Sequence, residues 1–174
     1  MPEYDWADLF DEILDRRPGF TAEAEQRFCE ELFAPISATE AAWLSQELKC
    51  ECDDWALPAV TIPASYLSLL RWSNGGSFRT GRRKWNLFPA LDEETGVRVM
   101  MLGYGVPEKT PGLLPIAFNG SGVFYGFDTN ADAVDGEYPI RAAECGYPNK
   151  GTWIAASLWD AVRGKEAIEE LWES

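Results

Sequence analysis

Two short runs of acids are the side chains in this sequence best suited to chemistry. Asp53-Asp54 and Asp92-Glu93-Glu94 each place neighbouring carboxylates in a loop. Carboxylate oxygens bind divalent cations, and two carboxyl groups with different pKa values serve as general acid and base. A carboxylate-dependent hydrolase is therefore one hypothesis, and it predicts a cleft in which two or more acids converge with shifted pKa values. In a chain with 29 acids, such runs also arise on an ordinary solvated surface.

The other common catalytic groups are missing or poorly placed. The chain has no histidine, which excludes Ser-His and Cys-His nucleophile pairs and histidine-ligated zinc. Its four cysteines are too few for a disulfide scaffold, and Cys50-x-Cys52 is too short and isolated to form half of a zinc site. Asn74-Gly75-Gly76 follows a helical segment instead of preceding one, unlike a phosphate-binding loop. We expect reduced thiols, no catalytic residue, no metal and no cofactor, and hence not an enzyme.

The charge of the chain is strongly negative and unevenly distributed. The net charge is −14 over 174 residues, and residues 1–57 hold fifteen acids and four basic side chains. Residues 58–174 hold fourteen acids and eleven basic side chains, and five of the latter gather as Arg71, Arg79, Arg82, Arg83 and Lys84. We expect an acidic end and one basic loop. Such a field repels nucleic acid and anionic membranes and attracts basic proteins, although an acidic surface can also serve solubility alone.

The acidic runs are also candidates for binding a protein partner. Trp55 follows Asp53 and Asp54 in an irregular segment, and an aromatic side chain flanked by acids is a common means of gripping a basic partner. The predicted partner-binding set is completed by Asp92, Glu93 and Glu94. The alternative for Trp55 is that its segment packs back on its own domain.

Three helices are predicted in the first 48 residues. The apolar residues near the start recur at the spacing of one helical face and predict a helix over residues 6–14; they are Trp6, Leu9, Phe10, Ile13 and Leu14. Thr21 is placed to cap a second helix, and Ser37-Ala38-Thr39-Glu40 is a capping box that opens a third. We expect residues 1–36 to be a helical N-terminal extension of a single domain, 1–174, with its core in residues 37–174.

The rest of the chain predicts one more helix and then mostly strands. Pro63 suits the start of a helix over residues 64–72, and Asn74-Gly75-Gly76 ends it, because Asn and Gly tolerate the left-handed conformation found after a helix. Strands are predicted on both sides of turns at Gly81 and at Asn119-Gly120-Ser121-Gly122, with a further edge strand over residues 137–142. Residues 92–104 fit either a strand or a helix.

A final helix opens at Ser157. Its candidates for burial are Leu158, Val162, Ile168, Leu171 and Trp172. With 46% apolar residues the chain is able to bury a substantial core. These elements predict an α+β fold in which helices pack against a central antiparallel sheet.

Two segments together resemble the SUKH superfamily, which includes a fungal cell-wall-assembly regulator and many bacterial immunity proteins. The first, residues 62–76, is similar to the family's Leu/Ile-Pro, aromatic, aliphatic, Asn-Gly-Gly signature, carried here by Pro63, Tyr66, Asn74, Gly75 and Gly76. The second, residues 114–128, is similar to the family's Pro-Ile-Ala hairpin that leads to an Asp, carried here by Pro115, Gly120, Gly122 and Asp128. The family often has an acid where this chain has Ser65.

The resemblance implies a fold of the same α+β class and a role in binding other proteins, most often as an immunity protein against a nuclease or deaminase toxin. The leading hypothesis is an immunity protein whose acidic surface meets a basic toxin domain, without a nucleic-acid or membrane partner. The alternative is an intracellular regulatory or scaffolding protein of the same fold. Nothing after Met1 resembles a signal peptide, and no apolar run reaches the roughly 18 residues that span a bilayer, so we expect a cytoplasmic protein.

Overall fold

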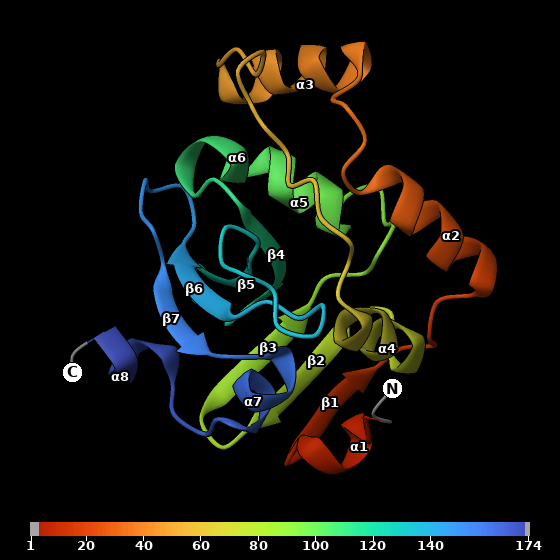
Figure 1. The fold of residues 1–174 in the computed structure, drawn as a ribbon, viewed down its shortest axis with the longest axis vertical. Helices are drawn as coiled ribbons and strands as arrows, with labels where there is room; N and C mark the ends of the chain where they lie inside the picture. The colour runs from red at the N-terminus through yellow and green to blue at the C-terminus, as the bar shows by residue number, and fades with distance from the viewer. Residues whose placement is uncertain (1–3, 173–174) are drawn as a thin grey trace.

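The computed structural model describes residues 4–172, apart from the side chain of Trp172, and is built around one seven-stranded sheet (Figure 1). All strand pairs are antiparallel, and neighbours in the sheet are neighbours in the sequence. The strands are β1 (Glu12–Arg16), β2 (Gly76–Thr80), β3 (Arg83–Leu87), β4 (Leu113–Phe118), β5 (Val123–Asp128), β6 (Ile140–Glu144) and β7 (Thr152–Ala155). The predicted α+β fold with a central antiparallel sheet is confirmed.

Helices lie on both faces of this sheet. They are α1 (Trp6–Leu9), α2 (Ala22–Glu31), α3 (Ala38–Leu48), α4 (Ala64–Trp72), α5 (Val97–Gly103), α6 (Val106–Lys109), α7 (Leu158–Arg163) and α8 (Ile168–Trp172). On β5, Phe127 contacts Tyr66 of α4, with ring centroids 5.8 Å apart. Phe124 contacts Tyr104 at the end of α5, at 5.2 Å. Positions an odd number apart on a strand point to opposite faces, so α4 and α5 cover different sides of the sheet.

The two segments that resemble the SUKH signatures pack against each other. The contact between Tyr66 and Phe127 joins the first to the second, and both rings are fully buried. In the first segment Pro63 immediately precedes α4, and the Asn74 carboxamide oxygen accepts a hydrogen bond from the Ala90 N–H at 2.7 Å. The second segment is the β4–β5 hairpin, in which Pro115 is buried. Positive φ angles occur at the glycines of both signatures, Gly75, Gly76, Gly120 and Gly122.

The predicted helix over residues 6–14 is wrong beyond Leu9. The chain turns at Phe10, and residues 12–16 form the edge strand β1 beside β2. Trp6 and Phe10 are buried as expected, but Ile13 and Leu14 are each 44% exposed. The apolar spacing fitted a helical face, yet pairing with the open edge of β2 satisfies the backbone of this segment instead. The N-terminal extension is thus partly helical and partly a strand of the sheet.

The C-terminal part also differs from the expectation in its details. The strand predicted over residues 137–142 is β6, which begins after Pro139 and lies inside the sheet, because an unpredicted strand, β7, pairs with its far side. The predicted final helix is divided into α7 and α8 at Gly164. Ser157 caps α7 as predicted, by accepting from the Asp160 N–H at 3.2 Å. The candidates Leu158, Val162 and Ile168 are buried, Leu171 is half-buried, and the side chain of Trp172 lies outside the described residues.

Residues 92–104, for which strand and helix were both open, form a turn followed by α5. Asp92 organises the turn: its Oδ1 accepts hydrogen bonds from the backbone N–H groups of Glu94 and Thr95, at 2.9 and 2.8 Å. Val97 and Met101 are fully buried one helical turn apart. The alternation that suggested a strand therefore belongs to the inner face of a short helix.

Candidate protein-binding surface

The predicted partner-binding residues lie at two separate places. Asp53, Asp54 and Trp55 belong to the loop that follows α3, whereas residues 92–94 precede α5 and lie beside α2 (Figure 1). The first group contributes to a groove of about 380 Å³ and the second to a groove of about 310 Å³, and the two share no lining residue. The fold does not bring the six residues together into one site.

Trp55 supports its own loop and is not a free aromatic anchor. Its half-buried ring packs on a small cluster formed by Leu44 of α3, Cys52 and Leu102 of α5. The backbone N–H of Trp55 also donates to the Cys52 carbonyl at 3.0 Å, and this bond closes the turn that carries Asp53 and Asp54. This packing agrees with the alternative that the segment folds back on its own domain, and Asp53 and Asp54 in the turn are exposed.

The end of α3 and the loop after it form an acidic surface, called here the acidic cap: Glu47, Glu51, Asp53 and Asp54. All four are exposed, and none forms an ion pair within residues 4–172. With Lys49 among them, the segment carries a net charge of −3. Two apolar side chains of α3, Trp43 and Leu48, are 37% and 38% exposed. The cap therefore combines unneutralised carboxylates with apolar surface.

Three acids elsewhere in the first 57 residues are paired with cations from later in the chain. The pairs join Glu12 to Arg79, Glu25 to Arg71 and Glu40 to Arg98. The N-terminal segment runs along one side of the molecule from α1 to α3 and is not gathered at one end as predicted (Figure 1). The acidic cap is thus one region of uncompensated negative charge on this side; Asp5, Asp8 and Glu23 also form no ion pair within residues 4–172.

The predicted basic loop is also used internally. Arg79 pairs with β1, and Arg82 pairs with Glu170 of α8. Arg83 is buried and donates to the carbonyls of Ala161 and Glu166, at 2.7 and 3.0 Å, which ties β3 to α7 and the chain after it. Burial lowers the pKa of Arg83. Of this cluster, only Lys84 is an exposed cation without an ion pair in the described part of the chain.

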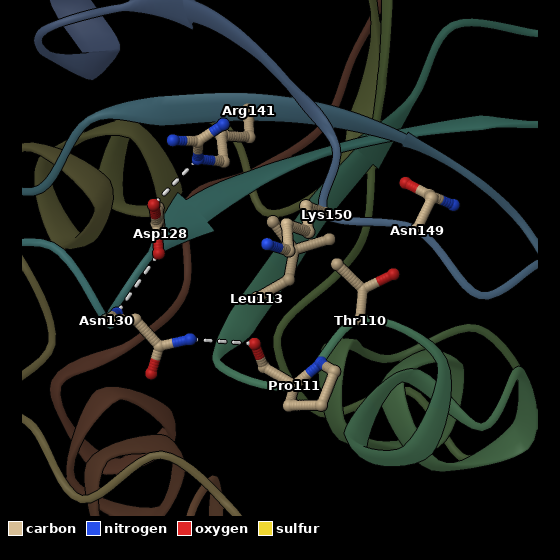
Figure 2. A pocket seen from close by; sticks show the side chains of 8 residues that line it. All are labelled: Thr110, Pro111, Leu113, Asp128, Asn130, Arg141, Asn149 and Lys150. Carbon is tan, nitrogen blue, oxygen red and sulfur yellow. Dashed lines mark hydrogen bonds and ion pairs between the residues drawn. The ribbon is translucent and has the colours of Figure 1, made fainter.

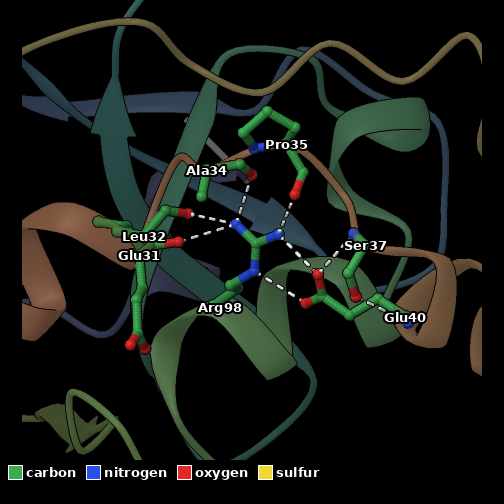
Figure 3. A network of polar contacts seen from close by, with 7 residues as sticks. All are labelled: Glu31, Leu32, Ala34, Pro35, Ser37, Glu40 and Arg98. Atoms are coloured by element: carbon green, nitrogen blue, oxygen red, sulfur yellow. Dashed lines mark hydrogen bonds and ion pairs between the residues drawn. The ribbon is translucent and has the colours of Figure 1, made fainter.

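A single arginine fixes the position of α3. Arg98 of α5 donates to backbone carbonyls at the end of α2 and in the link to α3, those of Glu31, Leu32, Ala34 and Pro35 (Figure 3). It also donates to both oxygens of Glu40, each at 2.8 Å. Glu40 in turn accepts from the Ser37 N–H at 3.0 Å, completing the predicted capping box. Hydrogen bonds from Arg98, and then from Ser37, lower the pKa of Glu40 to about 2.

The Asp92–Glu94 turn has a mixed electrostatic environment. The groove beside it is lined by Arg27 and Arg98 as well as by Glu31, Asp92 and Glu93. Hydrogen bonds from Thr95 and Glu94 hold the pKa of Asp92 below its usual value. A carboxyl that acts as a general acid requires a raised pKa, so the arrangement around Asp92 gives the hydrolase hypothesis no support. No cluster of three metal-ligating side chains occurs within residues 4–172.

A separate pocket, away from both grooves and of about 380 Å³, lies between α6, the end of β5 and the loop before β7 (Figure 2). Asp128, from the second SUKH-like segment, accepts a hydrogen bond from Arg141 of β6 at 2.7 Å. Lys150 also lines the pocket. Sequence reasoning placed Asp128 in a structural motif but missed Arg141 and Lys150, because only the pairing of β5 with β6 and the loop before β7 bring them together.

No protein-family model matches this sequence, and none of the curated proteins searched matches it. Among the described helices, none has the length and apolar character needed to cross a bilayer.

Proposed function

We propose that this protein is a protein-binding module of the immunity type, which neutralises a basic toxin domain by contact with the acidic cap. The single observation that carries the proposal is the combination of unpaired acids with the exposed side chains of Trp43 and Leu48 on the same short stretch of chain. Nuclease and deaminase domains that act on nucleic acid present basic surfaces, and such a surface complements the cap.

The two parts of the cap contribute differently to binding. Carboxylates without internal partners attract a basic protein over about one Debye length, near 10 Å at 0.1 M salt, and raise the rate of encounter. Affinity then depends on a few anchors that are desolvated on contact, and Trp is among the side chains enriched in that role. Trp43 is more exposed than Trp55 and is the anchor proposed here.

The fold is consistent with this function. The antiparallel sheet and the mutual packing of the two signature segments agree with what the resemblance to the SUKH superfamily implies. The Ser65 N–H and hydroxyl both donate to Glu137, so an acid from another part of the chain lies beside the position where the family often has its own. These features support the proposal that the chain is a SUKH-like protein, and the acidic cap is its proposed binding face.

The function is tested by co-expression with the toxin domain encoded directly upstream of this protein's gene. The wild-type protein is expected to restore growth of the host, and the triple variant Glu51→Lys, Asp53→Lys, Asp54→Lys is expected not to. The matched control, Asp132→Lys, Glu144→Lys, Glu166→Lys, makes the same change in net charge at exposed acids outside the cap. Full toxicity in the presence of the wild-type protein, or an upstream gene that encodes no toxin, contradicts the proposal and favours the regulatory alternative.

A further inference from the structure

The pocket in Figure 2 has walls from four helices and strands and from one loop, and it contains none of the acidic cap. Thr110 and Pro111 come from the end of α6, Leu113 from β4, Asp128 from β5, Arg141 from β6 and Lys150 from the loop before β7. Its volume of about 380 Å³ falls in the range of pockets that bind small molecules.

The charges around this pocket are not balanced. Arg141 uses its Nε on Asp128 and has a longer bond, 3.4 Å, from Nη1 to the Gly151 carbonyl, while Nη2 makes no hydrogen bond within the described residues. Lys150 is exposed and forms no ion pair within residues 4–172. In Figure 2 its ammonium group lies on the side of the pocket that holds Asp128. The charged residues that line the pocket, two cations and one carboxylate, sum to +1, in a chain whose net charge is −14.

The loop that carries Lys150 is held in place by its neighbours. Asn149 donates its carboxamide to the carbonyls of Glu144 and Tyr147, at 3.3 and 2.8 Å, and accepts from the Gly151 N–H at 2.8 Å. The Asn149 N–H donates to the Lys109 carbonyl at 3.2 Å, which connects the loop to α6. The backbone at Lys150 is therefore preorganised, and binding an anion requires little ordering beyond the lysine side chain.

We propose that this pocket binds the carboxylate group of a small monocarboxylic acid. One negative charge neutralises the site, and the free Nη2 of Arg141 together with the Lys150 ammonium supplies charge-assisted donors for it. A dianionic phosphate is the poorer ligand, because Asp128 repels its second charge. Pro111, which is exposed, gives the carbon part of the acid an apolar surface to contact.

The test is a titration of the ¹⁵N-labelled full chain with N-acetylleucine, followed by the amide chemical shifts of residues 109, 110, 112, 113, 128–130 and 149–151. N-acetylleucinamide, which has the same shape without the charge, and inorganic phosphate are titrated in parallel. We expect saturable shifts in these residues with the acid, none with the amide, and affinity for phosphate lower than for the acid. Equal shifts with acid and amide, no shifts with the acid, or tighter binding of phosphate overturns the proposal.

Three variants test whether the chemical-shift changes arise from binding in this pocket. Lys150→Met is expected to weaken binding of N-acetylleucine at least about tenfold, the loss of a hydrogen bond to a charged group. Lys84→Met removes another exposed lysine without an ion pair in the described chain, and is expected to bind as the wild type does. The cap variant Glu51→Lys, Asp53→Lys, Asp54→Lys is also expected to bind the acid normally, which separates this site from the toxin-binding proposal. Unchanged binding in Lys150→Met contradicts the assignment.

Discussion

Arg98 joins three helices through one guanidinium group. It satisfies carbonyls at the end of α2, pairs with Glu40 in the first turn of α3, and is itself carried by α5. Its side chain is only 16% exposed, so removal leaves these acceptors without a partner in a poorly hydrated place.

We predict that Arg98→Met lowers the free energy of unfolding at pH 7 by about 2–4 kcal/mol, the usual range for breaking a largely buried charged network. The measurement is guanidinium chloride unfolding followed by tryptophan fluorescence. The control is Arg27→Met, which breaks an exposed ion pair with Glu31 on α2 and is expected to cost less than about 0.5 kcal/mol. Equal effects of the two variants contradict the role given to Arg98.

The same network predicts how stability depends on pH. The pKa of Glu40 falls from an ordinary value of 4.5 to about 2 in the folded protein. Its contribution is therefore present above pH 4.5 and is lost as the pH falls towards 2. Between pH 5 and pH 3 the wild type is expected to lose about 1–2 kcal/mol more stability than Arg98→Met does. Unfolding curves at the two pH values measure this difference, and parallel losses contradict it.

The exposed ring of Trp43 is assigned much of the energy with which the toxin domain is bound. Trp43→Ala is expected to weaken binding to the toxin domain at least about tenfold, as truncation of an anchor residue does. Tyr147→Ala is the control, since Tyr147 is 66% exposed but lies outside the acidic cap. Isothermal titration calorimetry measures both, and similar affinities for the two variants contradict the assignment of Trp43.

Among the elements, β1 depends on the absence of a side chain at Gly76. Gly76 has a φ of +106°, and a Cβ there would collide with the carbonyl oxygen of Asp15 in β1. Gly146 also has a positive φ, +78°, but a Cβ there would meet open space. Both positions therefore favour glycine because of their positive φ, but only Gly76 also has a neighbouring strand too close to admit a Cβ.

We predict that Gly76→Ala lowers the free energy of unfolding by about 1–3 kcal/mol more than Gly146→Ala does, because it adds a steric clash to a similar backbone strain. The amide hydrogens that β1 shares with β2 are expected to exchange faster in Gly76→Ala and not in Gly146→Ala. Hydrogen exchange measured by NMR gives this comparison, and unchanged protection of β1 in Gly76→Ala contradicts it.

Elements whose signals are local were predictable, and those that depend on distant partners were not. Thr21, Ser37 with Glu40, and the Asn119–Gly122 turn each act within four residues, and all form as expected. β1 and β7 each depend on a neighbouring strand with a free edge, which no window of sequence reveals. The residues of the candidate surface divide in the same way: Asp53 and Asp54 are exposed, but the inward packing of Trp55 depends on α5.

At the scale of the whole molecule, the net charge of −14 is a poor guide to where a partner binds. Ion pairs with Arg71, Arg79 and Arg98 neutralise three of the N-terminal acids, and the acidic cap is one of the places where acids stay unpaired within residues 4–172. Lys150, which forms no ion pair within residues 4–172, lines a separate pocket beside the Arg141–Asp128 pair. The molecule is thus electrically heterogeneous, with a proposed partner at one place and a proposed small anion at another.

The most direct test of the central claim is the association rate constant for the upstream-encoded toxin domain, measured by stopped-flow fluorescence between about 20 and 500 mM salt, where screening becomes strong. For the wild type and the control Asp132→Lys, Glu144→Lys, Glu166→Lys, the rate constant is expected to fall steeply as salt rises. For Glu51→Lys, Asp53→Lys, Asp54→Lys it is expected to be at least about tenfold lower at low salt and to approach the other two at high salt. Equal rate constants for the two triple variants, or a wild-type rate constant that does not change with salt, would contradict binding through the acidic cap.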